Sequence, residues 1–328
     1  MPSRSRFPVS DHCDGARFFN PHGPSARSFS DLPKWWWQRA RGAAQPWPAA
    51  FPACDPVVLP TTVPAGVMAA TFIGHATYLL QFRGLTVLTD PVFASRAGPF
   101  GLFGPKRVQP PALRLGELPR VDVVLLSHNH YDHLDLTTLR WLARHRRPLV
   151  VVPLGLKAWL EARGVTNLVE LDWWQSHFIS GGDEITCTPA QHWSSRWPWD
   201  RCRTLWGGFM IRTRQGAVWF AGDTGWGPHF AEVRARLGAP DCALLPIGAY
   251  EPRWFMEAVH MNPDEAVRAH LALGAKQSLA MHHGCFCLTD EGWDAPVRAL
   301  AAARAVHVVA DSFFRVPSVG ETVLVRLA

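Results

Sequence analysis

The sequence predicts an α/β protein in which two β-sheets pack face to face with helices on the outer faces. Two observations predict it: apolar runs of strand length occur in two batches, and segments with helical apolar spacing accompany each batch. No change in composition interrupts residues 66–328, so we expect one domain there. Residues 1–65, rich in Pro, Ser, Arg and Trp, are expected to form an N-terminal extension.

The first batch of strands opens the domain. Apolar runs at strand length predict strands at 67–73, 77–82, 85–90, 121–127 and 149–152. Helical spacing predicts helices at 136–146 and 156–163. Gly164 is the expected stop of the second helix, because glycine readily takes the left-handed conformation that ends helices.

The second batch follows the same rules. Strands are expected at 169–171, 184–188, 208–213, 217–221, 242–246 and 278–281. One helix should cover 228–237 and another 290–304. Between them, Asn262, Pro263 and Glu265 form a helix start with a capping box, and Gly274 ends that helix.

Composition limits the classes of function. The 33 Lys and Arg against 27 Asp and Glu leave a net charge of +6, which favours an anionic substrate such as a phosphate ester. No basic block is long enough to predict nucleic-acid binding. Seven scattered cysteines, an odd number, favour a reducing compartment, and we expect a cytoplasmic protein. No apolar run predicts a signal peptide or a transmembrane segment.

Three adjacent indoles mark the N-terminal extension. Trp35, Trp36 and Trp37 stand beside Lys34 and Arg39, as in anchors at a membrane surface, where indole prefers the water–lipid boundary. A peripheral membrane contact through these residues is one prediction. The other is that the indoles fill a groove on the protein's own surface, and the sequence leaves both open.

A dense group of ligand-type side chains follows the strand expected at 121–127. His128, His130, Asp132 and His133 lie within six positions. Burying four such groups together is costly unless a shared cation satisfies them. Because one ion does not comfortably use all four, the loop predicts two metal ions.

Further ligands are expected where later strands end. His192, Asp223 and His282 each follow an apolar strand. A carboxylate such as Asp223 is the natural bridge between two cations, because each of its oxygens can bind one. A solvated loop with scattered histidines is the competing interpretation of the pattern.

These residues resemble the metallo-β-lactamase superfamily of αββα-sandwich hydrolases, whose two mixed sheets carry helices on their outer faces. Six segments are similar to its branch of phospholipases D that hydrolyse N-acyl-phosphatidylethanolamine. They are Thr71 to Thr77, Thr89 to Pro91, Ser127 to Asp135, Glu170 to Trp174, Phe220 to Gly225 and Ile247 to Met256. The likeness spans about residues 65–290.

The resemblance implies two Zn²⁺ ions. One would be held by His128, His130 and His192, and the other by Asp132, His133 and His282, with Asp223 bridging them. His283 stands where the family usually has a bulky residue that is not a ligand. Its register with Gly284 makes His282 the expected ligand.

The resemblance also implies an activity. A hydroxide between the zinc ions would attack the phosphodiester of a phospholipid and release phosphatidic acid and an N-acylethanolamine, in lipid metabolism. Asp132, Asp223 and His260 would be catalytic, and His75 and Asp90 would orient metal ligands. Tyr250, Trp254 and His260 would line the substrate pocket. A homodimer is implied as well.

Two other functions remain open from the residues. One is hydrolysis of a lactone or of a phosphorylated small molecule, because lactonase-like relatives resemble the chain in the elements around His75 and Asp90. Loss of activity on vesicles, but not on a soluble diester, after changing Trp35 to Trp37 to Ala would separate a lipid enzyme from it. A non-catalytic membrane-associated or regulatory protein would bind metal without turnover.

Overall fold

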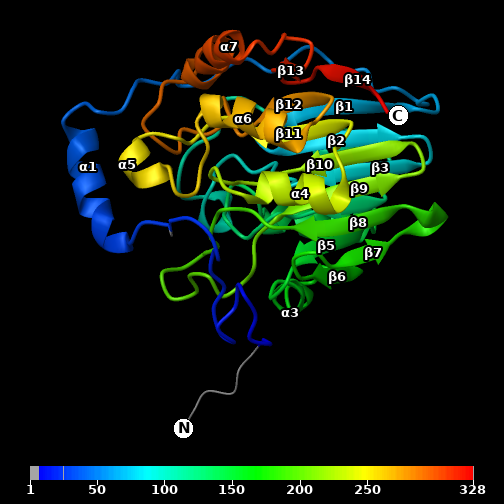
Figure 1. Ribbon diagram of the computed structural model, residues 1–328, viewed down its shortest axis with the longest axis horizontal. Helices are drawn as coiled ribbons and strands as arrows, with labels where there is room; N and C mark the ends of the chain where they lie inside the picture. Colours follow the sequence, from blue (N-terminus) through cyan, green and yellow to red (C-terminus); the bar gives the residue numbers. More distant parts are fainter. Residues whose placement is uncertain (1–6, 25, 328) are drawn as a thin grey trace.

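The computed structural model describes residues 7–24 and 26–327 and confirms the predicted sandwich (Figure 1). The first sheet has the order β14 (Thr322–Arg326), β1 (Val67–Gly74), β2 (Thr77–Phe82), β3 (Leu85–Thr89), β4 (Val123–Leu125), β5 (Leu149–Pro153) and β6 (Leu168–Leu171). The second has the order β13 (Phe314–Arg315), β12 (Gln277–Met281), β11 (Cys242–Pro246), β10 (Gly216–Phe220), β9 (Gly208–Thr213), β8 (Glu184–Thr188) and β7 (Ser176–Phe178).

Side-chain alternation along the strands builds the two layers of core. In β4, Val123 and Leu125 belong to the apolar cluster between the sheets, whereas Val124 packs on the outer face with Leu139 and Leu142 of a helix. Successive strand residues point to opposite faces, so a strand covered on both sides must be apolar throughout. This explains why the expected strands read as continuous apolar runs.

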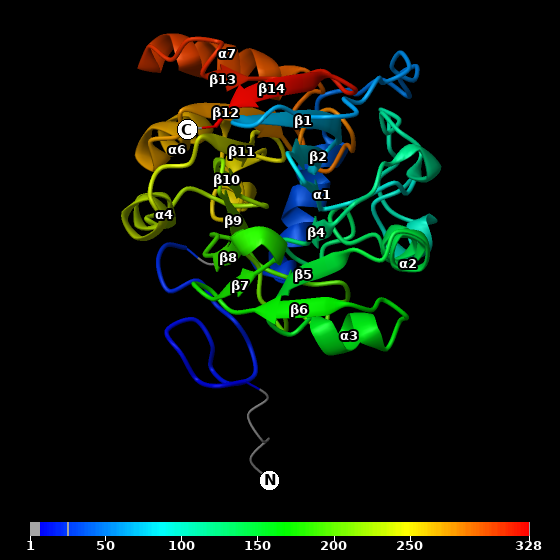
Figure 2. The same ribbon diagram turned by 90° about the vertical axis from the view of Figure 1, so that its right-hand side faces the viewer.

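Helices cover the outer faces (Figure 2). On the first sheet lie α2 (Leu136–His145) and α3 (Lys157–Glu161); on the second lie α4 (His229–Leu237) and α6 (Pro263–Leu273), with α7 (Ala295–His307) packed beside α6. The capping box of Asn262 and Glu265 is present, and Gly274 ends α6 with φ 64°. Among the described residues, no helix is long and apolar enough to cross a membrane.

The strand directions bring several loops to one edge of the sandwich. Strands β3 to β6 run parallel to one another, as do β10 to β13. The carboxyl ends of parallel strands meet at the same edge, which is where α/β sheets place their ligands. The loops that follow β4, β8, β10 and β12 therefore converge there.

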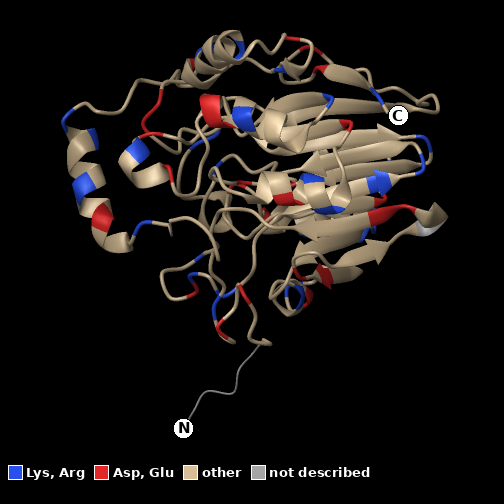
Figure 3. Ribbon diagram, in the orientation of Figure 1, with Lys and Arg blue, Asp and Glu red and all other residues tan. Residues whose placement is uncertain are grey.

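The N-terminal extension lies along this edge and contains a helix that the sequence did not predict. The turn Phe29–Asp31 leads into α1 (Leu32–Ala40), which stands next to the short helix α5 (Arg253–Met256) in Figure 1. Short 3-10 turns also occur at Pro99–Gly101, Leu115–Glu117 and Ser180–Gly182. Lys, Arg, Asp and Glu are interspersed over the ribbon, with basic residues on α1 (Figure 3).

Candidate metal centre

Three imidazoles from two loops form the first half of the site. His128 Nε2 lies 2.9 Å from His130 Nδ1, and His192 Nε2 lies 3.3 Å from that same atom. His128 and His130 come from the loop after β4, and His192 comes from the loop after β8. The structure thus brings together the three residues of the first predicted ligand set.

Hydrogen bonds on the far side of these rings fix where their protons are. His192 Nδ1 donates to the carbonyl of Val259 at 2.9 Å, since a carbonyl can only accept. Ser127 Oγ donates to Asp90 Oδ2, so this hydroxyl accepts from His128 Nδ1 at 2.9 Å. In a neutral ring the other nitrogen then carries a lone pair. Both Nε2 lone pairs consequently point into the cluster.

Burial keeps these rings neutral. It lowers the pKa of His130 to about 3 and that of His192 to about 4. The pKa of His128 is also held well below its usual value by burial. Three neutral imidazoles whose nitrogens face one another repel unless something electron-poor lies between them, which is the donor arrangement of a metal site.

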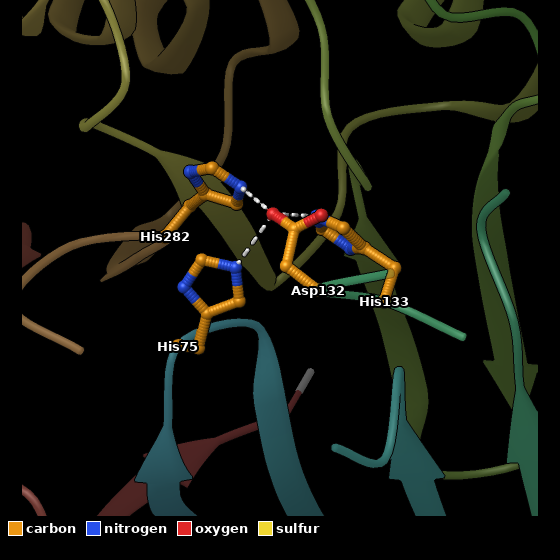
Figure 4. A group of neighbouring side chains, drawn as sticks. All are labelled: His75, Asp132, His133 and His282. Atoms are coloured by element: carbon orange, nitrogen blue, oxygen red, sulfur yellow. Dashed lines mark hydrogen bonds and ion pairs between the residues drawn. The ribbon is translucent and has the colours of Figure 1, made fainter. Parts of the chain in front are cut away.

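The second half of the site centres on a carboxylate (Figure 4). Asp132 Oδ2 lies 3.1 Å from His75 Nε2, 3.3 Å from His282 Nε2 and 3.4 Å from His133 Nε2. His133, behind it, donates from Nδ1 to Asp90 Oδ2 at 2.6 Å. This group contains the second predicted ligand set and adds His75 to it, so that His75 touches Asp132 directly.

Asp223, from the loop after β10, joins the two halves. Its Oδ2 lies 3.1 Å from Nε2 of both His133 and His282. The same oxygen lies 3.8 Å from Nε2 of His192 and 3.9 Å from that of His128. One carboxylate oxygen therefore faces both sets of imidazoles, and this position between them is the one expected of a bridging ligand.

The charges of the second half differ from those of the first. Burial lowers the pKa of His282, but the carboxylates of Asp223 and Asp132 raise it to about 9. Burial likewise opposes the charge on His133, yet Asp223, Asp132 and Asp90 hold its pKa well above the usual value. Protons on these rings take the place that a divalent cation would fill among three carboxylates.

The residues present fit a pair of divalent cations. Among the described side chains, several buried ring nitrogens and one carboxylate oxygen at the cluster have no hydrogen-bond partner. They are His75 Nδ1, His130 Nε2, His133 Nε2, His282 Nδ1, His260 Nδ1 and Asp223 Oδ1. Of these ring nitrogens, His133 Nε2 faces Asp132 and Asp223, whereas Nδ1 of His75 and of His282 lies on the side of its ring away from Asp132. Nitrogen and carboxylate donors in this number are typical of zinc. Unpaired buried polar atoms otherwise cost about 1–3 kcal/mol each.

The backbone at the site takes conformations that are rare outside glycine. His75, Asp90 and His282 have φ values of 59°, 29° and 60°. Such strain persists where the surrounding structure over-determines it, as it does at functional sites. His283, by contrast, stacks on Phe72 at 5.7 Å and belongs to none of the metal-type groups found among the described residues, so the geometry favours His282 as the ligand.

Asp90 supports the site from behind, as the prediction for a residue that orients ligands requires. It is fully buried and accepts hydrogen bonds from the backbone and hydroxyl of Ser127 at 2.7 and 2.5 Å, besides that of His133. Burial raises its pKa. A carboxylate on the outer nitrogen of a ligand histidine fixes the ring and its tautomer.

A cavity of about 300 Å³ opens above the cluster. Its floor includes His130, Asp132 and Asp223. His260 stands in its wall, grouped with His192 and Asp223, and burial holds its pKa well below the usual value. The remaining wall is mostly apolar and comes partly from α5 and the N-terminal extension: Phe29, Leu32, Trp35, Trp193, Phe255 and Met256.

Two residues predicted for this wall lie elsewhere. Tyr250 is buried beside Glu291 and Glu251, and burial raises its pKa to about 12. Trp254 turns its indole to Gln38 of α1, to which it donates at 3.0 Å. Neither is among the residues that line the cavity; beside them, Ala249 lines it in place of Tyr250, and Phe255 and Met256 of α5 line it in place of Trp254.

Arg196 is a support that sequence reasoning missed. Its Nη1 donates to the carbonyls of Asn129 and Leu134, both at 2.9 Å, and its guanidinium lies 3.9 Å above the ring of Tyr131. It therefore ties both ends of the His128–His133 loop to the loop that carries His192. In the sequence, Arg196 stands out only by lying four residues after His192, and this spacing does not by itself predict a contact with the His128–His133 loop.

Known proteins resemble this chain over most of its length. The family model described as the beta-lactamase superfamily domain matches residues 86–283. An uncharacterized Mycobacterium tuberculosis protein is 43% identical over 252 residues, covering 74% of this chain and 66% of the relative. N-acyl-phosphatidylethanolamine-hydrolyzing phospholipase D 1 of Caenorhabditis elegans is 40% identical over 227 residues, covering 66% of this chain and 64% of the relative.

The matches thus span less than two thirds of those relatives' own lengths. Among solved structures, an isothiocyanate hydrolase from Delia radicum gut bacteria superposes with a TM-score of 0.63 at 22% identity, covering 79% of this chain and 100% of that one. At this identity the likeness concerns the fold alone.

Proposed function

Because the chain belongs to the metallo-β-lactamase superfamily, we propose that it is a metal-dependent phosphodiesterase of the phospholipase D type, acting on lipids like N-acyl-phosphatidylethanolamine. The products would be phosphatidic acid and an N-acylethanolamine. One observation carries the proposal: Asp223 Oδ2 faces the imidazoles of both halves of the site, at the floor of a cavity with apolar walls.

The chain would hold two Zn²⁺ ions. His128, His130 and His192 would bind one and Asp132, His133 and His282 the other, with Asp223 shared and His75 beside Asp132 as a further nitrogen. When bound, such ions supply Lewis acidity that makes water nucleophilic at neutral pH and offsets charge building on a phosphate.

The chain's own residues would position the diester and move protons. His260, neutral and in the cavity wall, can donate a hydrogen bond to a phosphate oxygen. The reaction forms a bond from a water oxygen to phosphorus and breaks the bond from phosphorus to the ethanolamine oxygen. Asp132, which lies in the floor and is ionised, is the carboxylate placed to take the proton that the attacking water loses and to pass it to that departing oxygen.

The apolar wall suits an acyl chain, and α1 suits a membrane surface. Trp35 faces the protein: it stacks on Phe255 at 5.0 Å and donates to Asp290 Oδ2 at 2.7 Å. Trp36 and Trp37 face outward, with 61% and 59% of their surfaces exposed. We propose that Trp36 and Trp37 contact the membrane. Trp35 instead fills a groove on the protein's own surface, so each of the two interpretations holds for part of the group.

The test is a substrate panel with metal analysis. Zinc-loaded protein should hydrolyse N-acyl-phosphatidylethanolamine in vesicles, whereas plain lactone as the only substrate, or bound metal without any turnover, would contradict the proposal. Trp36→Ala/Trp37→Ala should lower activity on vesicles but not on a soluble diester. Trp35→Ala, which removes part of the cavity wall, should lower both.

A further inference from the structure

A second cavity lies on the other side of Tyr131 from the metal centre. It has a volume of about 390 Å³ and borders the first turn of α2, the loop 98–101 and α3. Tyr131 lines both cavities. The second cavity contains none of the candidate metal ligands described above. Four arginines line it: Arg96, Arg140, Arg163 and Arg196.

The positive charge of this cavity is only partly balanced by the protein, because four arginines face one acid in the wall and Asp200 acts on Arg196 alone among them. Among the described residues, none of the four arginines forms an ion pair with a carboxylate. The single acid in the wall, Asp135, is already used: Oδ1 accepts from the backbone of Thr137 and Thr138, and Oδ2 accepts from the backbone of Phe93 and Ala94. Such a cavity attracts an anion.

The guanidinium groups are held in place while keeping free donors. Arg163 lies 3.8 Å above the ring of Trp159 and donates from Nη1 to that residue's carbonyl at 3.0 Å. Arg140 donates from Nε to the carbonyl of Arg163 at 2.6 Å. Within the described chain, the other nitrogens of these two groups have no protein acceptor. A pre-positioned guanidinium fork matches the oxygens of a phosphate.

The rim of the cavity is apolar and exposed. Phe100, in the wall, has 79% of its surface exposed, and Trp197, also in the wall, has 40%. Close by in the same loops are Leu102, Phe103 and Trp199, which are exposed by 69%, 62% and 67%. Apolar side chains of this size gathered around a cationic pocket are typical of surfaces that meet a lipid bilayer.

We propose that this cavity binds the phosphate headgroup of an anionic phospholipid, such as phosphatidic acid, and anchors the protein to the membrane beside its active site. The arginines would hold the phosphate, and the loops of Phe100 and Trp197 would lie among the acyl chains. The exposed apolar rim assigns the phosphate to a lipid and not to a soluble ester. The proposal rests on the membrane contact proposed above, but not on the hydrolytic reaction.

Arg196 connects this site to the metal centre. The same guanidinium that lines the anion cavity donates to the carbonyls at both ends of the His128–His133 loop. A bound headgroup would therefore sit against a residue that braces the metal ligands. We keep Arg196 unchanged in the test, because a change there alters both sites.

Vesicle sedimentation without turnover tests the proposal. Neutral phosphatidylcholine vesicles measure the general membrane contact, and the gain on adding phosphatidic acid measures the site. Arg140→Gln/Arg163→Gln should reduce binding to phosphatidic acid vesicles by roughly 30-fold, as expected when two basic side chains near a surface are lost. Binding to neutral vesicles should stay the same.

A charge-matched control removes two exposed arginines at the opposite edge of the sandwich, in Arg83→Gln/Arg214→Gln. It should bind within about twofold of the unchanged protein, since surface attraction of this kind acts only near the membrane. Arg140→Lys/Arg163→Lys, which keeps the charge but not the guanidinium fork, should restore part of the binding and shows that the cavity still folds.

Three results would overturn the proposal. Equal losses in the Arg140/Arg163 and Arg83/Arg214 variants would mean that total charge alone matters. No loss in either would remove the site. Release of the protein from phosphatidic acid vesicles by low concentrations of glycerol phosphate would mean that the cavity takes a soluble phosphate. Failure to hydrolyse any diester would leave this binding result untouched.

Discussion

At the scale of single residues, the site depends on ring nitrogens that are turned towards one another. Three ligand histidines have their outer nitrogens bound: His128 by Ser127, His192 by Val259 and His133 by Asp90. Each ring therefore turns its Nε2 inward. Sequence could predict these ligands because each follows a strand that ends at the same edge.

Asp223→Asn should remove the shared carboxylate oxygen's charge while keeping its shape. We expect metal content to fall below two equivalents and diester turnover to fall by more than the roughly 10- to 100-fold that outer-shell changes cause. Elemental analysis and turnover on a soluble diester measure both. Full metal content with full activity would exclude Asp223 as a ligand.

Asp90→Asn tests whether Asp90 holds the ring of His133 in the orientation that metal binding needs. Because Asp90 orients His133 through a 2.6 Å hydrogen bond, zinc affinity should fall roughly 10- to 100-fold. Competition with a chelator measures it. Asp122→Asn is a suitable control, since that carboxylate caps Thr86 in the same sheet away from the cluster. Equal effects of the two changes would contradict a role for Asp90.

Several of the elements that sequence patterns missed bury little apolar surface, although β14, which was also missed, buries Val323 and Val325. Helix α1 has no buried residue, so it shows no apolar spacing, and β13 has only two residues. The last helix begins at Ala295 and not at the predicted residue 290. Asp290 instead accepts from Trp35, and Glu291 accepts from the backbone of Ala249, so their side chains hold neighbouring loops.

The N-terminal extension is fastened near the site by packing between distant segments, which no local pattern reveals. Asn20 donates to the carbonyl of His192 at 2.9 Å. His12, buried and stacked on Trp173 at 4.4 Å, contacts Asp172 at 2.8 Å and Asp11 at 2.5 Å. We infer that this segment steadies the loop of His192 from behind.

His12 should make that attachment depend on pH. Burial alone would lower its pKa, but hydrogen bonds to Asp172 and Asp11 raise it above 6.5. The stabilisation is therefore complete below pH 6.5 and is lost as the pH rises through the higher, folded-state value. His12→Gln should lower the melting temperature more at pH 5.5 than at pH 9. An equal drop at both, or the same pattern in the exposed control His22→Gln, would contradict this.

The two-sheet architecture of the whole molecule could be predicted from the pattern of strands, and the resemblance to the family predicted how the sheets and helices are arranged. Continuous apolar runs predicted buried strands, and two batches of them predicted two sheets. Which loops meet above the metal centre could not be predicted, because the cavity wall combines residues near 30, 130, 193 and 255. The homodimer and the cytoplasmic location remain predictions.

Metal removal should destabilise the entire domain, since it leaves repelling groups buried at the joint edge of both sheets. A ligand at about 100 times its dissociation constant contributes about 2.7 kcal/mol. At about 2–4 °C per kcal/mol for a large domain, chelation should lower the melting temperature by roughly 5–10 °C. Zinc should restore it in the unchanged protein but not in Asp223→Asn. An unchanged melting temperature would mean that no metal is bound.

The most direct test of the central claim follows oxygen from water into the product. N-acyl-phosphatidylethanolamine vesicles are incubated with the zinc-loaded protein in ¹⁸O-labelled water, and both products are analysed by mass spectrometry. We expect one labelled oxygen in phosphatidic acid and none in the N-acylethanolamine, because water attacks phosphorus. Label in the N-acylethanolamine, or no phosphatidic acid at all, would contradict it.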